Sequence, residues 1–146
     1  MSAQVRVTAD YDRVYGFLKE EPEREARVLA RWKDEGSKET MTFMRGIVPV
    51  KTGFLRESIT RKQSSKGFLV YATAKYAPFV DRGTLPHWIF LKNASVLRWF
   101  GSWGIPVFAK RAYHSGTKAV HFVERTKEAM RQVLKQLYMA IWREQS

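Results

Sequence analysis

The sequence contains no cysteine. This absence excludes disulfide bonds, zinc sites with thiolate ligands and cysteine nucleophiles, and it is typical of a protein assembled in the cytoplasm. Long hydrophobic runs are missing too, because no stretch approaches the ~18 apolar residues of a membrane span. The first five residues lack the basic and apolar regions of a signal peptide. We therefore expect a protein that starts in the cytoplasm and has no membrane partner.

Carboxylates are scarce in the middle of the chain, where Glu57 and Asp81 are the only two. General acid–base catalysis and metal binding both need several titratable groups that converge. The histidines, His87, His114 and His121, do not have i, i+4 spacing, although the last two could meet in the fold. Phosphate-binding loops and nucleophile motifs are absent. The sequence therefore predicts no enzyme, no catalytic residues, no metal site and no cofactor.

The excess of positive charge is confined to one part of the chain. Of the net charge of +12, none comes from residues 1–48, which carry nine basic and nine acidic residues. Residues 49–146 carry seventeen basic and five acidic residues. Such an asymmetry favours a surface that faces a polyanion. A generally basic, solvated surface is the alternative interpretation.

The apolar content is sufficient for a core. The chain has 146 residues, of which 45% are hydrophobic and 14% aromatic, which fits a single domain over residues 1–146. Aromatic side chains fill cores, and they also supply contact area at protein interfaces. We divide the domain into a strand and helices (1–48), a sheet with loops (49–118) and a C-terminal helix (119–146).

The hydrophobic pattern predicts helices before position 48. We expect a short strand at residues 5–7, followed by a helix capped by Asp12. Pro22 is typical of a first helical residue, and the pattern continues to about Gly46. The apolar side of this helix weakens at Gly36, which predicts a kink or a break there.

The second half is predicted to be mostly sheet. Thr52 is expected to cap a helical turn over 52–59, and two strands joined by a turn are expected within 61–80. A hairpin tip is predicted at 100–104, and i, i+3, i+4 spacing predicts a helix from about 119 to 143. The fold class is α+β, with a long N-terminal helical region, a mostly antiparallel β-sheet with a protruding hairpin, and a closing C-terminal helix.

A mixture of basic and aromatic residues favours one alternative function. Aromatic residues Phe68, Tyr71 and Tyr76 interleave with four basic ones. Proteins use such a mixture to follow phosphates and stack bases. The basic residues are Arg61, Lys62, Lys66 and Lys75. A half-buried sheet edge produces the same alternation, and no helix-turn-helix signature accompanies it. The alternative is thus a free-standing basic, non-sequence-specific nucleic-acid-binding domain.

Three segments together point to one family. Residues 49–59 (PVKTGFLRESI) resemble the "P-v-x-T-G-x-L-R-x-S-I" segment of the tail-completion family of long-tailed double-stranded DNA phages and prophages. Residues 76–84 (YAPFVDRGT) resemble a second family segment, "Y-A-x-x-V-E-x-G-T", with Asp81 in place of the usual Glu and Arg82 where an aromatic or apolar residue is frequent. Residues 114–123 are similar to a third, which precedes the last helix.

The family's members, also described as tail-to-head joining or minor tail components, are structural proteins of the virion neck. The resemblance implies a homo-oligomeric ring, usually a hexamer, around the DNA channel. Its partners would be the tail tube protein, the head-completion or connector proteins, and passing genomic DNA bound without sequence specificity. The expected location is the neck and tail of the virion, after assembly in the host cytoplasm.

Two sets of candidate residues follow. Arg56 is expected to pair with Asp81 or Glu57 or to face a neighbouring subunit, and the aromatic residues near the hairpin tip are expected either to dock a partner or to fill a core. The interface candidates are Thr52, Arg56, Asp81, Arg82, Trp99, Phe100 and Trp103. The candidates for DNA-channel electrostatics are Arg61, Lys62, Lys66 and Lys75.

Overall fold

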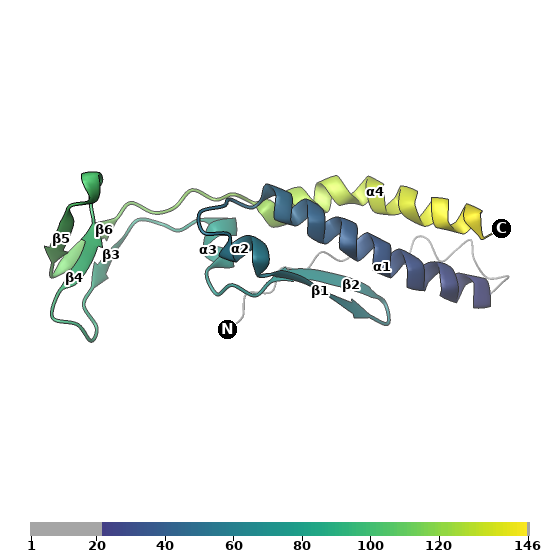
Figure 1. Cartoon of the computed structure of the whole chain (residues 1–146), viewed down its shortest axis with the longest axis horizontal. Coiled ribbons are helices and arrows are strands. Elements are labelled where there is room, and N and C mark those ends of the chain that lie inside the picture. Colours follow the sequence, from purple (N-terminus) through teal and green to yellow (C-terminus); the bar gives the residue numbers. More distant parts are fainter. Residues whose placement is uncertain (1–21, 146) are drawn as a thin grey trace.

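The structure, a computed structural model, describes residues 22–145. The strand expected at residues 5–7 and the helix expected after Asp12 lie outside the described residues. Two long helices, α1 (Pro22–Ile47) and α4 (Phe122–Glu144), run side by side (Figure 1). We call residues 22–82 and 119–145 the body, and residues 83–118 the arm.

Within the described residues, helix α1 spans Pro22–Ile47, and Pro22 is tolerated in a first helical turn because the N–H that proline lacks is not needed there. The break predicted at Gly36 is wrong, since α1 continues to Ile47 without interruption. A Cβ at Gly36 would lie only 2.9 Å from Leu134 Cδ2 and 3.2 Å from Phe68 Cε1. The gap in the apolar pattern therefore marks a place where side chains of α4 and of the β1–β2 hairpin pack closely against α1.

The core of the body is organised around Trp32. Its Nε1 donates a hydrogen bond to the carbonyl of Leu134 at 2.8 Å, and its ring lies 5.2 Å from that of Phe68 and 6.5 Å from that of Tyr138, measured between centroids. The side chain is 4% exposed. Helices α1 and α4 and the hairpin thus share one apolar core.

A hairpin formed by β1 (Ile59–Ser64) and β2 (Gly67–Ala72) covers one side of α1. Alternate residues of β2 are buried, so one face of the hairpin packs against the core. The two predicted strands are confirmed, but the prediction of strand up to residue 80 is wrong. Residues Ala77–Arg82 form a helix, α3, because Pro78 lies in its first turn, where its fixed φ suits a helix.

The predicted helical turn after Thr52 is present as α2 (Phe54–Glu57). The N-cap was assigned wrongly: Gly53, at φ 84°, is the N-cap residue, and no side-chain hydrogen bond caps the N-terminus of this helix. Ser58 follows the helix, and its hydroxyl donates to the carbonyl of Leu55 at 2.8 Å. The carbonyl of Gly53 accepts the N–H of Glu57 at 3.0 Å, which is the first hydrogen bond of the helix.

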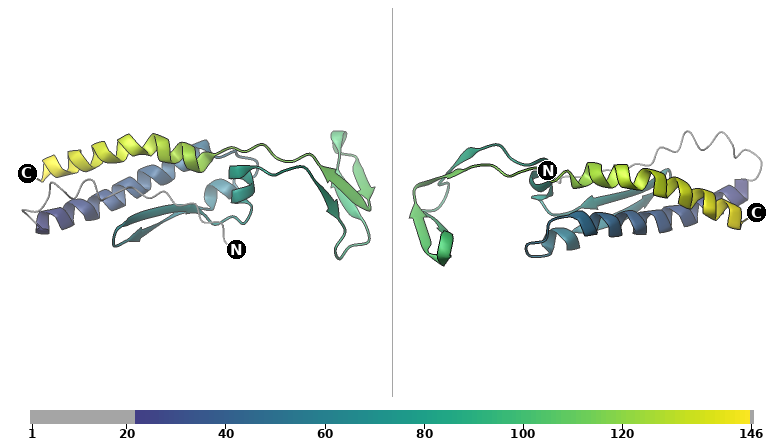
Figure 2. Two further views of the ribbon diagram at one scale, coloured as in Figure 1. Left: turned by 180° about the vertical axis from the view of Figure 1, so that it is seen from behind. Right: turned by 90° about the horizontal axis from the view of Figure 1, so that it is seen from above.

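The arm contains two separate antiparallel ladders instead of a continuous sheet. Strand β3 (His87–Phe90) pairs with β6 (Arg111–His114), and β4 (Leu97–Phe100) pairs with β5 (Pro106–Ala109). The predicted hairpin tip is a 3-10 turn, η2 (Ser102–Gly104), whereas β6 was not predicted. Figures 1 and 2 show the arm extending away from the end of the body that holds α2 and α3. The α+β class with a protruding hairpin and a closing helix is confirmed.

Candidate interaction surface on the arm

The arm is held at its root by backbone hydrogen bonds between its outgoing and returning segments. Thr84 and Thr117 exchange N–H···O bonds of 3.0 and 3.1 Å. Next to them, the N–H of Val120 donates to the carbonyl of Val80 at 3.1 Å. The returning segment is thus fixed to α3 before α4 begins.

Two glycines permit this close crossing. Gly83 (φ 75°) and Gly116 (φ 88°) each precede one of the paired threonines. A Cβ on Gly83 would collide with the carbonyl oxygen of Thr117, and a Cβ on Gly116 would collide with that of Thr84. Both the positive φ and the lack of space exclude any larger residue without rearrangement. The two Gly-Thr pairs therefore determine where the arm leaves the body.

Asp81 joins the root to the first turn of α4. Its side chain is 9% exposed, and Oδ1 accepts the N–H of Val123 at 3.0 Å. Its carbonyl accepts the N–H of His121 at 2.9 Å. A carboxylate at a helix N-terminus satisfies a free N–H and interacts favourably with the helix dipole. Asp81 was predicted to be an interface residue, but its carboxylate accepts a hydrogen bond from its own chain.

The other interface candidates near the root are exposed. Within residues 22–145, Arg56 forms no ion pair with Asp81 or Glu57, so the expected internal pairing of Arg56 is not present. Thr52, Arg56 and Arg82 all have exposed side chains. Arg56 lies in α2, Thr52 precedes that helix and Arg82 ends α3, so all three belong to the end of the body from which the arm projects.

The arm has no buried residue. Every residue from 82 to 121 is exposed or half-buried. Of the sixteen large hydrophobic side chains exposed in the described part of the chain, eleven belong to the arm: Leu85, Trp88, Ile89, Phe90, Val96, Trp99, Phe100, Trp103, Ile105, Phe108 and Tyr113. An accumulation of exposed apolar side chains of this kind is typical of an interaction site.

The three aromatic residues predicted near the hairpin tip are all exposed, so they do not form a core within the chain. Trp99 is 39%, Phe100 66% and Trp103 95% exposed. Trp103 also adopts a left-handed conformation with φ 70°, which is unfavourable for a residue with a side chain. The turn thus holds an indole ring in water at a conformational cost.

Each ladder of the arm carries an arginine stacked on aromatic rings. The Arg98 guanidinium lies 5.4 Å from the Phe100 ring centroid and 5.8 Å from that of Phe108. The Arg111 guanidinium lies 5.1 Å from the Trp88 ring centroid. Sequence reasoning missed Arg98 and Arg111. Aromatic and arginine side chains are the residues most enriched in the energetically dominant parts of protein interfaces.

The arm is basic as well as apolar. It contains five Lys or Arg residues and no Asp or Glu. This absence of acidic residues and the density of aromatic residues after position 87 are the sequence signals that distinguish the arm.

The candidates for DNA-channel electrostatics do not form one cluster. The guanidinium of Arg61 contacts Asp34 Oδ1 at 2.8 Å and Ser37 Oγ at 2.7 Å, so Arg61 stabilises the packing of the hairpin on α1. Lys62, Lys66 and Lys75 are exposed. Lys66 lies in the hairpin turn and Lys75 follows the other end of β2, about 20 Å along a six-residue strand.

His114, which the sequence left free to meet His121, faces His87. His87 and His114 are partners in the β3–β6 register, with ring centroids 5.1 Å apart. Among the described residues, no group of three or more potential ligand side chains is placed to hold a metal ion. In the same part of the chain, no helix has the length and apolar character needed to cross a membrane.

The chain was compared with protein-family models, with curated proteins and with solved structures, and none of them matches it.

Proposed function

We propose that this protein is a structural component of a phage neck that completes the tail and joins it to the head connector. The observation that carries this proposal is the arm: a projecting segment with no buried residue and eleven exposed large hydrophobic side chains. Such a surface is unfavourable in a protein that acts alone, and it suits a subunit that is covered during assembly.

The resemblance to the tail-completion family supports the location of that assembly. The residues that resemble its second segment form the root of the arm: Ala77 is buried, Asp81 caps α4, and Gly83 and Thr84 form the crossing. The first segment contributes Leu55 and Ile59 to the core of the body. The resembling residues thus support the part of the molecule that presents the arm.

In this proposal the protein forms a ring, with six copies as the family resemblance implies, around the channel through which DNA passes. Dispersed Lys62, Lys66 and Lys75 suit a lumen in which DNA slides, because phosphate contacts without base contacts carry no sequence preference. The tail tube and the head connector proteins are the other partners. The proposed role is structural, without catalysis.

The test is the mass of the purified protein, alone and mixed with tail tubes, by light scattering and negative-stain microscopy. We expect rings, of about 100 kDa for six copies of the 17.0 kDa chain, or caps on the ends of tubes. A monomer that ignores tubes but binds duplex DNA with strong salt dependence would contradict the proposal. That result would favour the nucleic-acid-binding alternative.

A further inference from the structure

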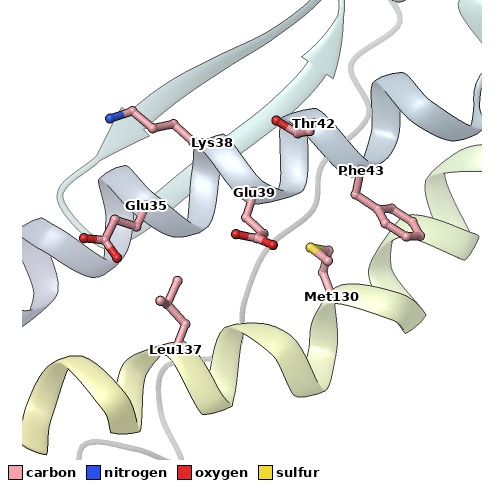
Figure 3. A pocket seen from close by; sticks show the side chains of 7 residues that line it. All are labelled: Glu35, Lys38, Glu39, Thr42, Phe43, Met130 and Leu137. Carbon is pink, nitrogen blue, oxygen red and sulfur yellow. The ribbon is translucent and has the colours of Figure 1, made fainter.

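We propose that the arm tip of one copy, meaning η2 and the adjoining end of β4, docks into a groove between α1 and α4 of a second copy. This inference rests on the proposed function, because it names the contact that would build the ring. The groove has a volume of about 490 Å³, and Figure 3 shows Glu39, Phe43, Met130 and Leu137 in the space between the two helices. It is lined by Phe43, Met130 and Leu137 and by the polar residues Glu35, Lys38, Glu39 and Thr42.

The charge that this groove leaves without an ion pair in the described part of the chain is negative. Glu35 forms an ion pair with Arg31 at 2.6 Å, and Lys38 forms one with Asp34 at 2.6 Å. Glu39 is exposed, points from α1 toward α4 (Figure 3), and has no ion pair within the described chain. A partner that brings a positive charge and apolar side chains would satisfy both the carboxylate and the apolar floor.

The arm tip has this chemistry. Trp103, at 95% exposed, lies in the turn between β4 and β5, and Arg98 lies on strand β4. No acidic residue in the arm would oppose Glu39. A large aromatic ring seated on an apolar floor, with a charged pair at the rim, is the arrangement of an interface hot spot.

A second copy is favoured over other occupants by the distribution of charge. The chain as a whole carries +12, and α1 carries six basic and five acidic residues, but the groove itself is lined by two carboxylates, Glu35 and Glu39, and one lysine, Lys38. The chain's own surface therefore contains a local acidic site that complements its own basic arm. An unrelated basic partner is not needed to explain Glu39.

The shape of the molecule requires the contact to be between copies. The arm extends away from the body (Figures 1 and 2), so its tip does not reach the groove of its own chain. Two different surfaces then meet in a head-to-tail contact, which repeats and closes into a ring when the rotation between neighbours allows it. One contact would both cover the arm tip and generate the oligomer.

The test uses the absence of native cysteine. We would mix one protein carrying Thr42→Cys, in the groove, with another carrying Ser102→Cys, beside Trp103, and oxidise them under conditions in which the wild type forms rings. We expect a disulfide-linked pair of the two variants, and a ladder of linked copies from the double variant. Ser65→Cys, in the β1–β2 turn, replaces Thr42→Cys as the matched control and is expected to link at least about tenfold more slowly, because it is not close to the tip.

Rings that form while the 42–102 link is no faster than the 65–102 link would overturn the docking inference and leave the proposed function standing. Absence of any ring or tube cap would overturn both. A second measurement compares Glu39→Lys with Glu128→Lys, an equal charge change on an exposed part of α4 outside the groove. We expect only Glu39→Lys to weaken self-association, by about tenfold or more. Equal weakening by both variants would contradict the assigned groove.

Discussion

The body and the arm place their tryptophans in opposite environments. Trp32 in the body is 4% exposed and holds α1 to α4 and β2 through a hydrogen bond and ring contacts. Trp103 in the arm is 95% exposed. Burial of a large aromatic side chain stabilises a fold, whereas exposure of several of them provides contact area for a partner. The body accordingly accounts for folding, and the arm for association.

The largest expected effect is on the stability of the body. Trp32→Ala removes a buried ring and its hydrogen bond to Leu134, and we expect it to lower the free energy of unfolding by about 3–5 kcal/mol. Trp103→Ala is its counterpart in the arm and should change that free energy by less than about 0.5 kcal/mol. Urea denaturation followed by circular dichroism measures both. Similar losses for the two variants would show that the arm contributes to the stability of the isolated chain.

A smaller effect is expected at the root of the arm. Gly116→Ala adds a Cβ where the carbonyl of Thr84 already lies, whereas Gly104→Ala, also at positive φ, adds one in open space. Both variants share a conformational cost of about 1–2 kcal/mol, but only Gly116→Ala should open the Thr84–Thr117 pairing. Amide hydrogen exchange at Thr84 and Thr117 measures this. Unchanged protection in Gly116→Ala would contradict the role assigned to the crossing.

The helix cap provided by Asp81 should contribute about 1 kcal/mol. Asp81→Ala removes the acceptor for the N–H of Val123, and loss of such a cap costs about 0.5–2 kcal/mol. Asp81→Asn keeps an acceptor oxygen and loses only the charge, so we expect a smaller decrease. Thermal unfolding of the two variants gives the order. A larger loss for Asn than for Ala would be incompatible with capping.

The smallest effect concerns pH and the body alone. Hydrogen bonds from Lys38, and next from Arg61, lower the pKa of Asp34 from its ordinary value of about 3.9. A lowered folded pKa stabilises the fold above the unfolded value, and this stability is lost as pH falls through the folded value. The difference in unfolding free energy between wild type and Asp34→Asn should thus be constant above about pH 5 and shrink below about pH 4. A difference that grows in acid would contradict these contacts.

The sequence predicted best those elements whose pattern is local. The 3.6-residue periodicity gave α4, and the alternation at Phe68, Val70 and Ala72 gave β2. Prediction from the sequence failed where a long-range contact determines the local structure. Gly36 suggested a helix break because its packing against Leu134 cannot be seen along the chain, and β6 was missed because its pairing with β3 joins residues far apart in sequence.

The candidate site was predicted in part for the same reason. The exposed aromatic residues at 99, 100 and 103 were selected because they cluster at a predicted turn. Arg61 was selected for its charge and Asp81 for its place in the segment that resembles the family, yet both contact residues of their own chain, Asp34 and Val123 respectively. A charged residue's partner depends on the fold, so composition alone does not distinguish an internal contact from an interface.

The most direct test of the account is the accessibility of the arm tip before and after assembly. Ser102→Cys places the chain's only thiol beside Trp103 and retains every aromatic side chain of the arm. The rate at which a small thiol reagent modifies it would be measured in the isolated chain and in rings or tube caps, with Ser65→Cys as the control. We predict that assembly slows modification at position 102 by about tenfold or more and leaves position 65 unchanged. Equal rates at position 102 in the two states would show that the arm is not covered by a partner, and would contradict the account.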